Sequence, residues 1–152
     1  MKKAYQFSLP DQDNKIHSLK DYAGKKILLY FYPKDDTPGC TKEACNFRDR
    51  LDQLTNHGLV VLGVSKDSPE SHVKFREKYS LTFPLLSDEQ LEAAKGYGVW
   101  VEKSMFGKKY MGIQRDSFLI DEDGNIIKHY KKVKPAGHVD EVLKDLEALN
   151  NS

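Results

Sequence analysis

Residues 33–45 read PKDDTPGCTKEAC, and the predicted fold of the chain is organised around them. They follow Ile27–Tyr32, a short apolar run rich in aromatic residues that is typical of a strand buried on both faces. Pro33 ends this strand. Thr37 has the hydroxyl group that a helix N-cap needs, and Pro38 suits the first helical position, where its missing N–H is no loss. The stretch therefore predicts a strand, a tight loop and the start of a helix.

Both cysteines of the chain lie in this stretch. Cys40 falls in the first helical turn, where unpaired backbone N–H groups and the helix dipole stabilise a thiolate relative to a thiol. Cys45 follows five residues later. On an unbroken helix that spacing puts the two Cα atoms roughly 8 to 9 Å apart, whereas a disulfide needs less than about 7 Å. If the two cysteines bond, the first helical turn must unwind.

The composition indicates one domain spanning residues 1–152, with a net charge of +1 and interspersed acidic and basic residues. This pattern favours neither nucleic acid nor an anionic membrane as a partner. The basic start, Met1–Lys3, precedes no apolar segment of signal-peptide length, and no run approaches a membrane span. We therefore expect a cytoplasmic protein, in which two cysteines are better explained by catalysis or redox chemistry than by a structural disulfide.

The rest of the chain alternates between strand and helix patterns. The period-two segments Tyr5–Leu9 and Lys15–Leu19 predict an N-terminal hairpin, and Asp121–Gly124 predicts a second hairpin turn. Val99–Gln114 is interpreted as a long surface loop. We expect strands at Leu59–Ser65, Phe83–Leu86, Ser117–Ile120 and Asn125–Lys132, and helices at Thr41–His57, Ser68–Tyr79, Leu91–Tyr97 and Gly137–Leu149. The order strand, helix, strand, helix indicates a parallel sheet.

The stretch resembles the active site of the peroxiredoxins, whose motif P-x-x-x-[TS]-x-x-C is matched by Pro33, Thr37 and Cys40. A second cysteine five residues later, within TPGCTKEAC, resembles the peroxiredoxin Q or bacterioferritin comigratory protein subfamily. The segments Phe83–Asp88 and Arg115–Asp121 extend the resemblance over nearly the whole chain. The resemblance implies an α/β, thioredoxin-like fold, with a central mixed sheet flanked by helices and an N-terminal β-hairpin extension.

The same resemblance implies a thiol peroxidase that needs no cofactor and serves antioxidant defence. Its Cys40 thiolate would attack the terminal oxygen of hydrogen peroxide or an organic hydroperoxide, which leaves a sulfenic acid. Cys45 would then condense with that sulfenic acid to an intramolecular disulfide. Thioredoxin or a similar dithiol protein would recycle the disulfide, and the chain would act as a monomer.

Each remaining site residue has a plain structural explanation beside the role that the resemblance implies. Thr37 caps the helix, and its hydroxyl is also suited to donate to the thiolate or to hold the peroxide. Pro33 ends a strand, and in the family it shields the thiolate from water. Arg115 matches the arginine of the family motif R-x-[TS]-F and would be a permanent cation beside the thiolate, although a solvated charge or a pair with Asp116 is the plain alternative. Glu43 suits the first helical turn, and in the family it orients that arginine.

Other functions remain open at this point. The cysteine spacing C-x4-C and five scattered histidines indicate no zinc or haem site; the histidines are His17, His57, His72, His129 and His138. A protein thiol-disulfide oxidoreductase would have the same fold, but the chain lacks a C-x-x-C motif. A redox sensor or holdase without enzymatic activity would share the unwinding of the helix. Loss of added peroxide in the presence of a thioredoxin system distinguishes the three.

Overall fold

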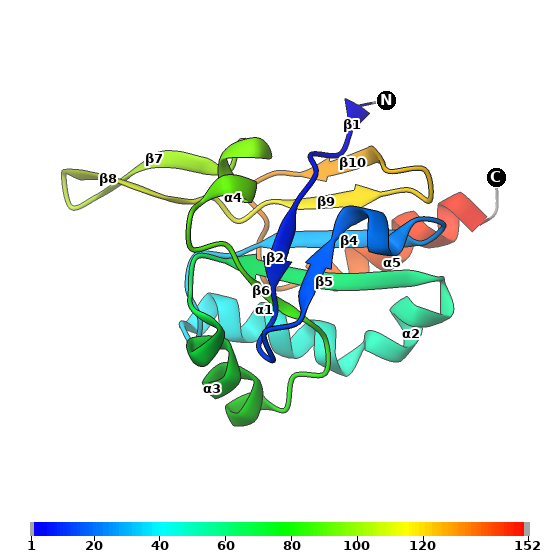
Figure 1. Ribbon diagram of the computed structural model, residues 1–152, viewed down its shortest axis with the longest axis horizontal. Helices are drawn as coiled ribbons and strands as arrows, with labels where there is room; N and C mark the ends of the chain where they lie inside the picture. The colour runs from blue at the N-terminus through cyan, green and yellow to red at the C-terminus, as the bar shows by residue number, and fades with distance from the viewer. Residues whose placement is uncertain (1, 151–152) are drawn as a thin grey trace.

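The computed structural model describes residues 2–150, which are arranged around one central sheet (Figure 1). The strands of this sheet are β1 (Lys2–Lys3), β4 (Lys26–Phe31), β5 (Leu59–Ser65), β6 (Leu85–Ser87), β9 (Ser117–Ile120) and β10 (Asn125–Tyr130). Their spatial order is β1-β10-β9-β4-β5-β6. The pairs β4–β5 and β5–β6 are parallel, and the other pairs are antiparallel. The predicted mixed sheet is therefore confirmed.

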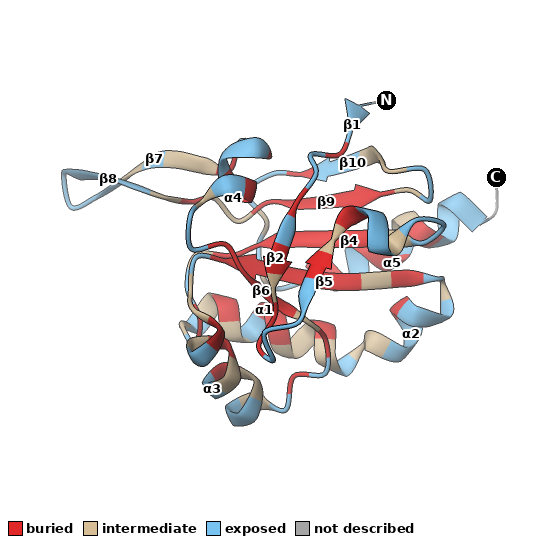
Figure 2. Cartoon of the chain, viewed as in Figure 1, coloured by how far each residue is buried: buried red, intermediate tan, exposed pale blue. Residues whose placement is uncertain are grey.

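Alternate residues of β4 belong to two separate cores on opposite faces of the sheet (Figure 2). Leu28 and Tyr30 pack with the helices α1 (Pro38–Asp49), α2 (Leu51–Asn56), α3 (Pro69–Tyr79) and α5 (His138–Asn150). Ile27 and Leu29 face the other core, which includes α4 (Glu92–Gly96) and the short 3-10 helix η1 (Leu19–Tyr22). Because both faces of β4 are buried, its sequence is apolar at every position after Lys26.

The N-terminal hairpin covers part of the second core. It consists of β2 (Ser8–Pro10) and β3 (Ile16–Ser18), which pair with each other and not with the central sheet. Leu9 of β2 and Leu19, the first residue after β3, are both buried in that core. The predicted hairpin extension is thus confirmed, with shorter strands than the period-two pattern suggested.

The single helix predicted over Thr41–His57 is wrong, because the chain forms two helices that meet at Arg50. Arg50 has φ −111° and ψ 11°, outside the helical range, and it is both the C-cap of α1 and the N-cap of α2. The buried residues Phe47 and Leu54 keep helical spacing across the break. Hydrophobic periodicity therefore could not reveal the interruption.

The long loop predicted over Val99–Gln114 is also wrong. This segment is a hairpin of β7 (Trp100–Met105) and β8 (Lys108–Ile113), which projects away from the body of the molecule (Figure 1). Phe106 and Gly107 join the strands with φ values of 51° and 78°, which suit a tight two-residue turn. Much of the hairpin is exposed on both faces, so it lacks the alternation that marks a half-buried strand.

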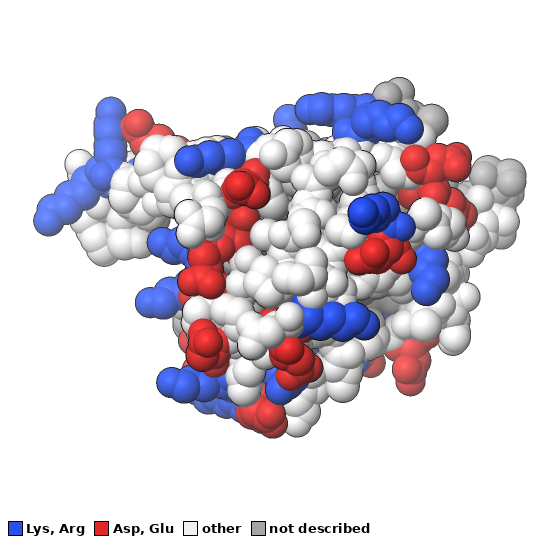
Figure 3. All heavy atoms as spheres, in the orientation of Figure 1, with Lys and Arg blue, Asp and Glu red and all other residues white. Residues whose placement is uncertain are grey.

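Charged side chains of both signs lie interspersed on the face of the molecule drawn in Figure 3. This distribution agrees with the net charge of +1. Within residues 2–150, no helix has the length and apolar character that crossing a bilayer requires.

Candidate active site

Cys40 is the third residue of α1 and therefore lies in its first turn, as predicted. Thr37 is the N-cap, with φ −95° and ψ 156°, and its carbonyl oxygen accepts the Thr41 N–H at 2.8 Å. Cys40 is 1% exposed, whereas Cys45 is half-buried. Both thiols are free, and α1 continues without interruption through both positions.

The Thr37 side chain does not make the capping hydrogen bond that we expected. Its hydroxyl donates to the carbonyl oxygen of Lys34 at 2.9 Å and accepts no N–H from the helix. The loop before α1 brings this carbonyl within reach, so the single hydroxyl proton is used within the loop. The oxygen lone pairs of Thr37 are left to accept a hydrogen bond.

Arg115 lies against the first turn of α1, although 75 residues separate it from Cys40. β9 runs antiparallel to β4, and the Phe31 N–H donates to the Asp116 carbonyl at 2.8 Å. This pairing brings the residues before β9 beside the end of β4. Arg115 Nη2 donates to Cys40 Sγ at 3.3 Å, and Nη1 donates to Glu43 Oε1 at 2.9 Å. The structure thus brings together three of the predicted site residues.

Burial sets the electrostatics of this group. Glu43 is fully buried, and burial raises its pKa from 4.5 to about 7 although Arg115 beside it acts in the opposite direction. Its Oε2 atom has no hydrogen-bond partner among residues 2–150. Burial disfavours the charged guanidinium of Arg115, but Glu43 and Cys40 leave its pKa above the ordinary value. Arg115 therefore stays a cation. A neighbour that stabilises a thiolate must keep its positive charge.

The Asp116 carboxylate bonds to residues other than Arg115. A pair with Asp116, the alternative role considered for Arg115, is therefore not formed. The Asp116 carboxylate is buried and accepts hydrogen bonds from Gln114 Nε2, His129 Nε2 and the Lys132 N–H, at 2.9, 2.7 and 2.9 Å. These contacts fix the segment from which Arg115 extends. The sequence gives no sign of this role of Asp116, because two of its three donors, His129 and Lys132, lie 13 and 16 residues away along the chain.

Pro33 lies two residues after the end of β4, is half-buried and belongs to the loop that leads to Cys40. Asp35 lies in the same loop and is buried, although nothing in our sequence analysis assigned it a role. Its buried partner His72 was noted only as one of the scattered histidines. The helical spacing of His72 with the buried residue Phe75 is the one signal that could have placed it inside the fold.

Comparison with known proteins agrees with this fold. A family model described as the AhpC/TSA family matches residues 1–129, so the chain belongs to the AhpC/TSA family. A Coxiella burnetii protein assigned as a peroxiredoxin bcp is 57% identical over 141 residues, which is 93% of each chain. The peroxiredoxin Bcp of Bacillus subtilis is 48% identical over 148 residues and covers 97% of this chain and 94% of its own.

Solved structures give the same result. The Xanthomonas campestris bacterioferritin comigratory protein has a TM-score of 0.89 and 39% identity, over 93% of this chain and 90% of its own. The thioredoxin-like fold is thereby confirmed, and so is the subfamily resemblance. The protein is a thiol-dependent peroxidase of the peroxiredoxin type, and the two-cysteine arrangement fits the Bcp and peroxiredoxin Q group.

Proposed function

We propose that Cys40 is the nucleophile that reduces the peroxide and that Cys45 resolves the product. The Cys40 thiolate attacks the terminal oxygen of ROOH, the O–O bond breaks, and the leaving alkoxide takes a proton to become ROH. Cys40 is left as a sulfenic acid. The Cys45 sulfur then attacks the Cys40 sulfur, a disulfide forms, and water leaves.

One observation carries this proposal: the Arg115 Nη2 atom donates to Cys40 Sγ at 3.3 Å in the first turn of a helix. The guanidinium and the helix N-terminus both stabilise a thiolate in a buried position. Glu43 orients the guanidinium through the contact at 2.9 Å. A bare carboxylate so close to Cys40 would disfavour the thiolate, so Glu43 suits the site only because it is paired.

Thr37 and Pro33 have supporting roles in this proposal. Because the Thr37 hydroxyl donates to Lys34, its oxygen is suited to accept the O–H of a bound peroxide. Pro33 has no N–H to offer to water and shields the thiolate from the side of the loop.

The substrates are hydrogen peroxide and organic hydroperoxides. The Xanthomonas campestris relative has alkyl peroxide reduction activity, which supports the organic class for this chain. The disulfide is recycled by thioredoxin or a similar dithiol protein. In this proposal the chain acts in the cytoplasm as a single-domain monomer, with no nucleic acid or membrane partner.

The test is peroxide consumption by the purified protein with a thioredoxin system. Wild-type protein should consume both hydrogen peroxide and an organic hydroperoxide, and Cys40→Ser should abolish turnover. Turnover that persists in Cys40→Ser would contradict the assignment. A protein disulfide oxidoreductase would instead reduce insulin disulfides without peroxide.

A further inference from the structure

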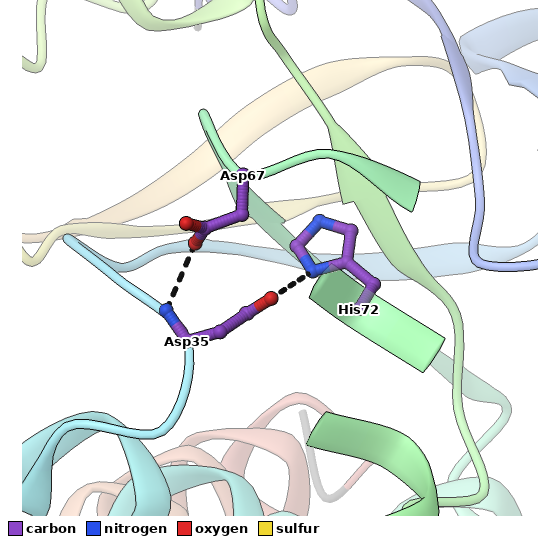
Figure 4. Close-up of side chains that lie close together, drawn as sticks. All are labelled: Asp35, Asp67 and His72. Atoms are coloured by element: carbon purple, nitrogen blue, oxygen red, sulfur yellow. Dashed lines mark hydrogen bonds and ion pairs between the residues drawn. The ribbon is translucent and has the colours of Figure 1, made fainter. Parts of the chain in front are cut away.

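The loop between β4 and α1 is fixed to the neighbouring elements at Asp35 (Figure 4). The Asp35 carboxylate accepts hydrogen bonds from His72 Nδ1 at 2.7 Å and from the Tyr32 hydroxyl at 2.6 Å. The backbone N–H of Asp35 donates to the Asp67 carboxylate at 2.8 Å. The Ser71 hydroxyl donates to the same carboxylate at 2.8 Å. These five residues, Tyr32, Asp35, Asp67, Ser71 and His72, are called the loop anchor below.

Three residues of the loop anchor, Tyr32, Asp35 and His72, are buried, and Asp67 and Ser71 are half-buried. His72 is 0% exposed and Asp35 is 8% exposed. The second ring nitrogen of His72, Nε2, faces the carbonyl oxygen of Leu86 at 3.2 Å, and this nitrogen must carry a proton because a carbonyl only accepts. The other ring nitrogen, Nδ1, lies 2.7 Å from the Asp35 carboxylate. Removing either partner leaves the other buried and without its main hydrogen bond.

The residue after Asp35 has a strained backbone that further contacts hold. Asp36 has φ +57°, in the left-handed region that a non-glycine residue rarely adopts. Its carboxylate accepts hydrogen bonds from Lys78 Nζ and the Tyr79 hydroxyl, each at 2.8 Å. Ser71 and His72 of α3 contact Asp35, and Lys78 and Tyr79 of the same helix contact Asp36. Both aspartates are therefore held by α3. Such strain persists only where the surroundings hold it.

We propose that the loop anchor is a positioning device for the peroxide-reducing site. The inference rests on the proposed function of Cys40. Thr37 and Cys40 follow Asp35 by two and five residues, on the same short segment. The position of the Thr37 oxygen relative to Cys40 is therefore set by where α3 holds Asp35. Small displacements of a reacting group are costly to rate, so His72 acts on the reaction through Asp35 without touching the peroxide.

The loop anchor also sets the boundary of the unwinding that a Cys40–Cys45 disulfide requires. Residues up to Asp36 are held by α3, whereas the first turn of α1 is held by its own backbone hydrogen bonds. Unwinding therefore starts after Asp36, and the loop keeps its place for the helix to re-form after reduction.

The chain offers a matched control in a second buried histidine–aspartate–tyrosine group. His17 Nε2 lies 2.7 Å from Asp11 Oδ2, its Nδ1 contacts the Tyr22 hydroxyl, and the group belongs to the N-terminal hairpin region. His17→Asn and His72→Gln make the same chemical change at their pairs, because each variant lacks a polar atom at the ring nitrogen that faces the aspartate, Nε2 in His17 and Nδ1 in His72. They differ in whether the pair holds the loop before Cys40.

The experiment measures two quantities on reduced protein: the second-order rate constant with hydrogen peroxide by stopped flow, and hydrogen exchange of the loop amides at residues 34–37. We expect His72→Gln to lower the rate constant about tenfold or more and to speed exchange of these amides. His72→Asn, whose amide nitrogen lies near the position of Nδ1, should restore most of the rate. His17→Asn, the matched control, should change neither quantity.

A His72→Gln protein that matches His17→Asn in both quantities would overturn the proposal. If His72→Gln does not fold, Ser71→Ala replaces it, because half-buried Ser71 donates to the same Asp35 carboxylate. The rate constant and the exchange rates are then measured on Ser71→Ala. A wild-type protein that consumes no peroxide would instead refute the proposed function, and the exchange rates alone would then decide whether the loop anchor holds the loop.

Discussion

Arg115 and Glu43 form a partly buried ion pair, with Nη1 and Oε1 2.9 Å apart, and the pair directs the other terminal nitrogen of the guanidinium at Cys40. Glu43 comes from α1 and Arg115 from the segment before β9, so the contact joins a helix to the sheet. The guanidinium makes two hydrogen bonds at once, one to the Glu43 carboxylate and one to the Cys40 sulfur. A residue with a single charged nitrogen cannot fill both in the same geometry.

Arg115→Lys should therefore lower kcat/KM for peroxide about 100-fold, by analogy with the loss of one preorganised donor at a reacting charge. The rate of Cys40 oxidation in stopped flow checks this prediction. Arg50→Lys, at an arginine that pairs with Asp140 in another part of the molecule, serves as the control and should react like wild type. Equal rates for the two variants would remove Arg115 from the site.

Glu43 should make the stability of the reduced protein depend on pH between about 4.5 and 7, because burial raises its pKa from the first value to the second. The folded state then binds the Glu43 proton more tightly than the unfolded state does. The contribution is fully present below pH 4.5 and is lost as the pH rises to about 7, by an amount on the order of 3 kcal/mol.

Glu43→Gln should lose this dependence. Urea unfolding at pH 5 and pH 8 measures it: the free energy of unfolding of wild type should fall, relative to the variant, as the pH rises. Glu89→Gln, at an exposed position, should behave like wild type. If wild type and Glu43→Gln keep a constant difference across this range, the raised pKa is refuted.

The sequence predicted the local part of the site and the strands around it, because these depend on short-range patterns. The apolar run at Ile27–Tyr32 forms β4 up to Phe31, and Thr37 caps α1, which begins at Pro38 as expected. The contact between Arg115 and Cys40 has no local signature, and only the family resemblance suggested it. The loop anchor was missed because a buried histidine and an aspartate 37 residues apart look like ordinary polar positions.

The sequence also misjudged the two segments whose burial does not follow a simple period. The break at Arg50 leaves the spacing of buried residues unchanged, and the hairpin at Trp100–Ile113 is exposed on both sides. Patterns of apolar residues report burial, and neither feature changes burial in a periodic way.

Oxidation should unwind the first turn of α1. Both cysteines lie on the intact helix, where five residues separate Cα atoms by roughly 8 to 9 Å, beyond the reach of a disulfide. Hydrogen exchange at residues 41–45 should be much faster in the oxidised protein than in the reduced protein, while the amides of β5 keep their protection. Oxidised protein that contains the Cys40–Cys45 disulfide and still keeps its first turn protected would contradict the prediction.

The mass of the intact protein after one equivalent of hydrogen peroxide tests the central claim most directly. Wild type should lose two hydrogens as Cys40 and Cys45 join, Cys45→Ser should gain one oxygen as a sulfenic acid, and Cys40→Ser should stay unchanged. A wild-type protein that gains oxygen without losing hydrogens, or a Cys40→Ser protein that reacts as fast as wild type, would contradict the account.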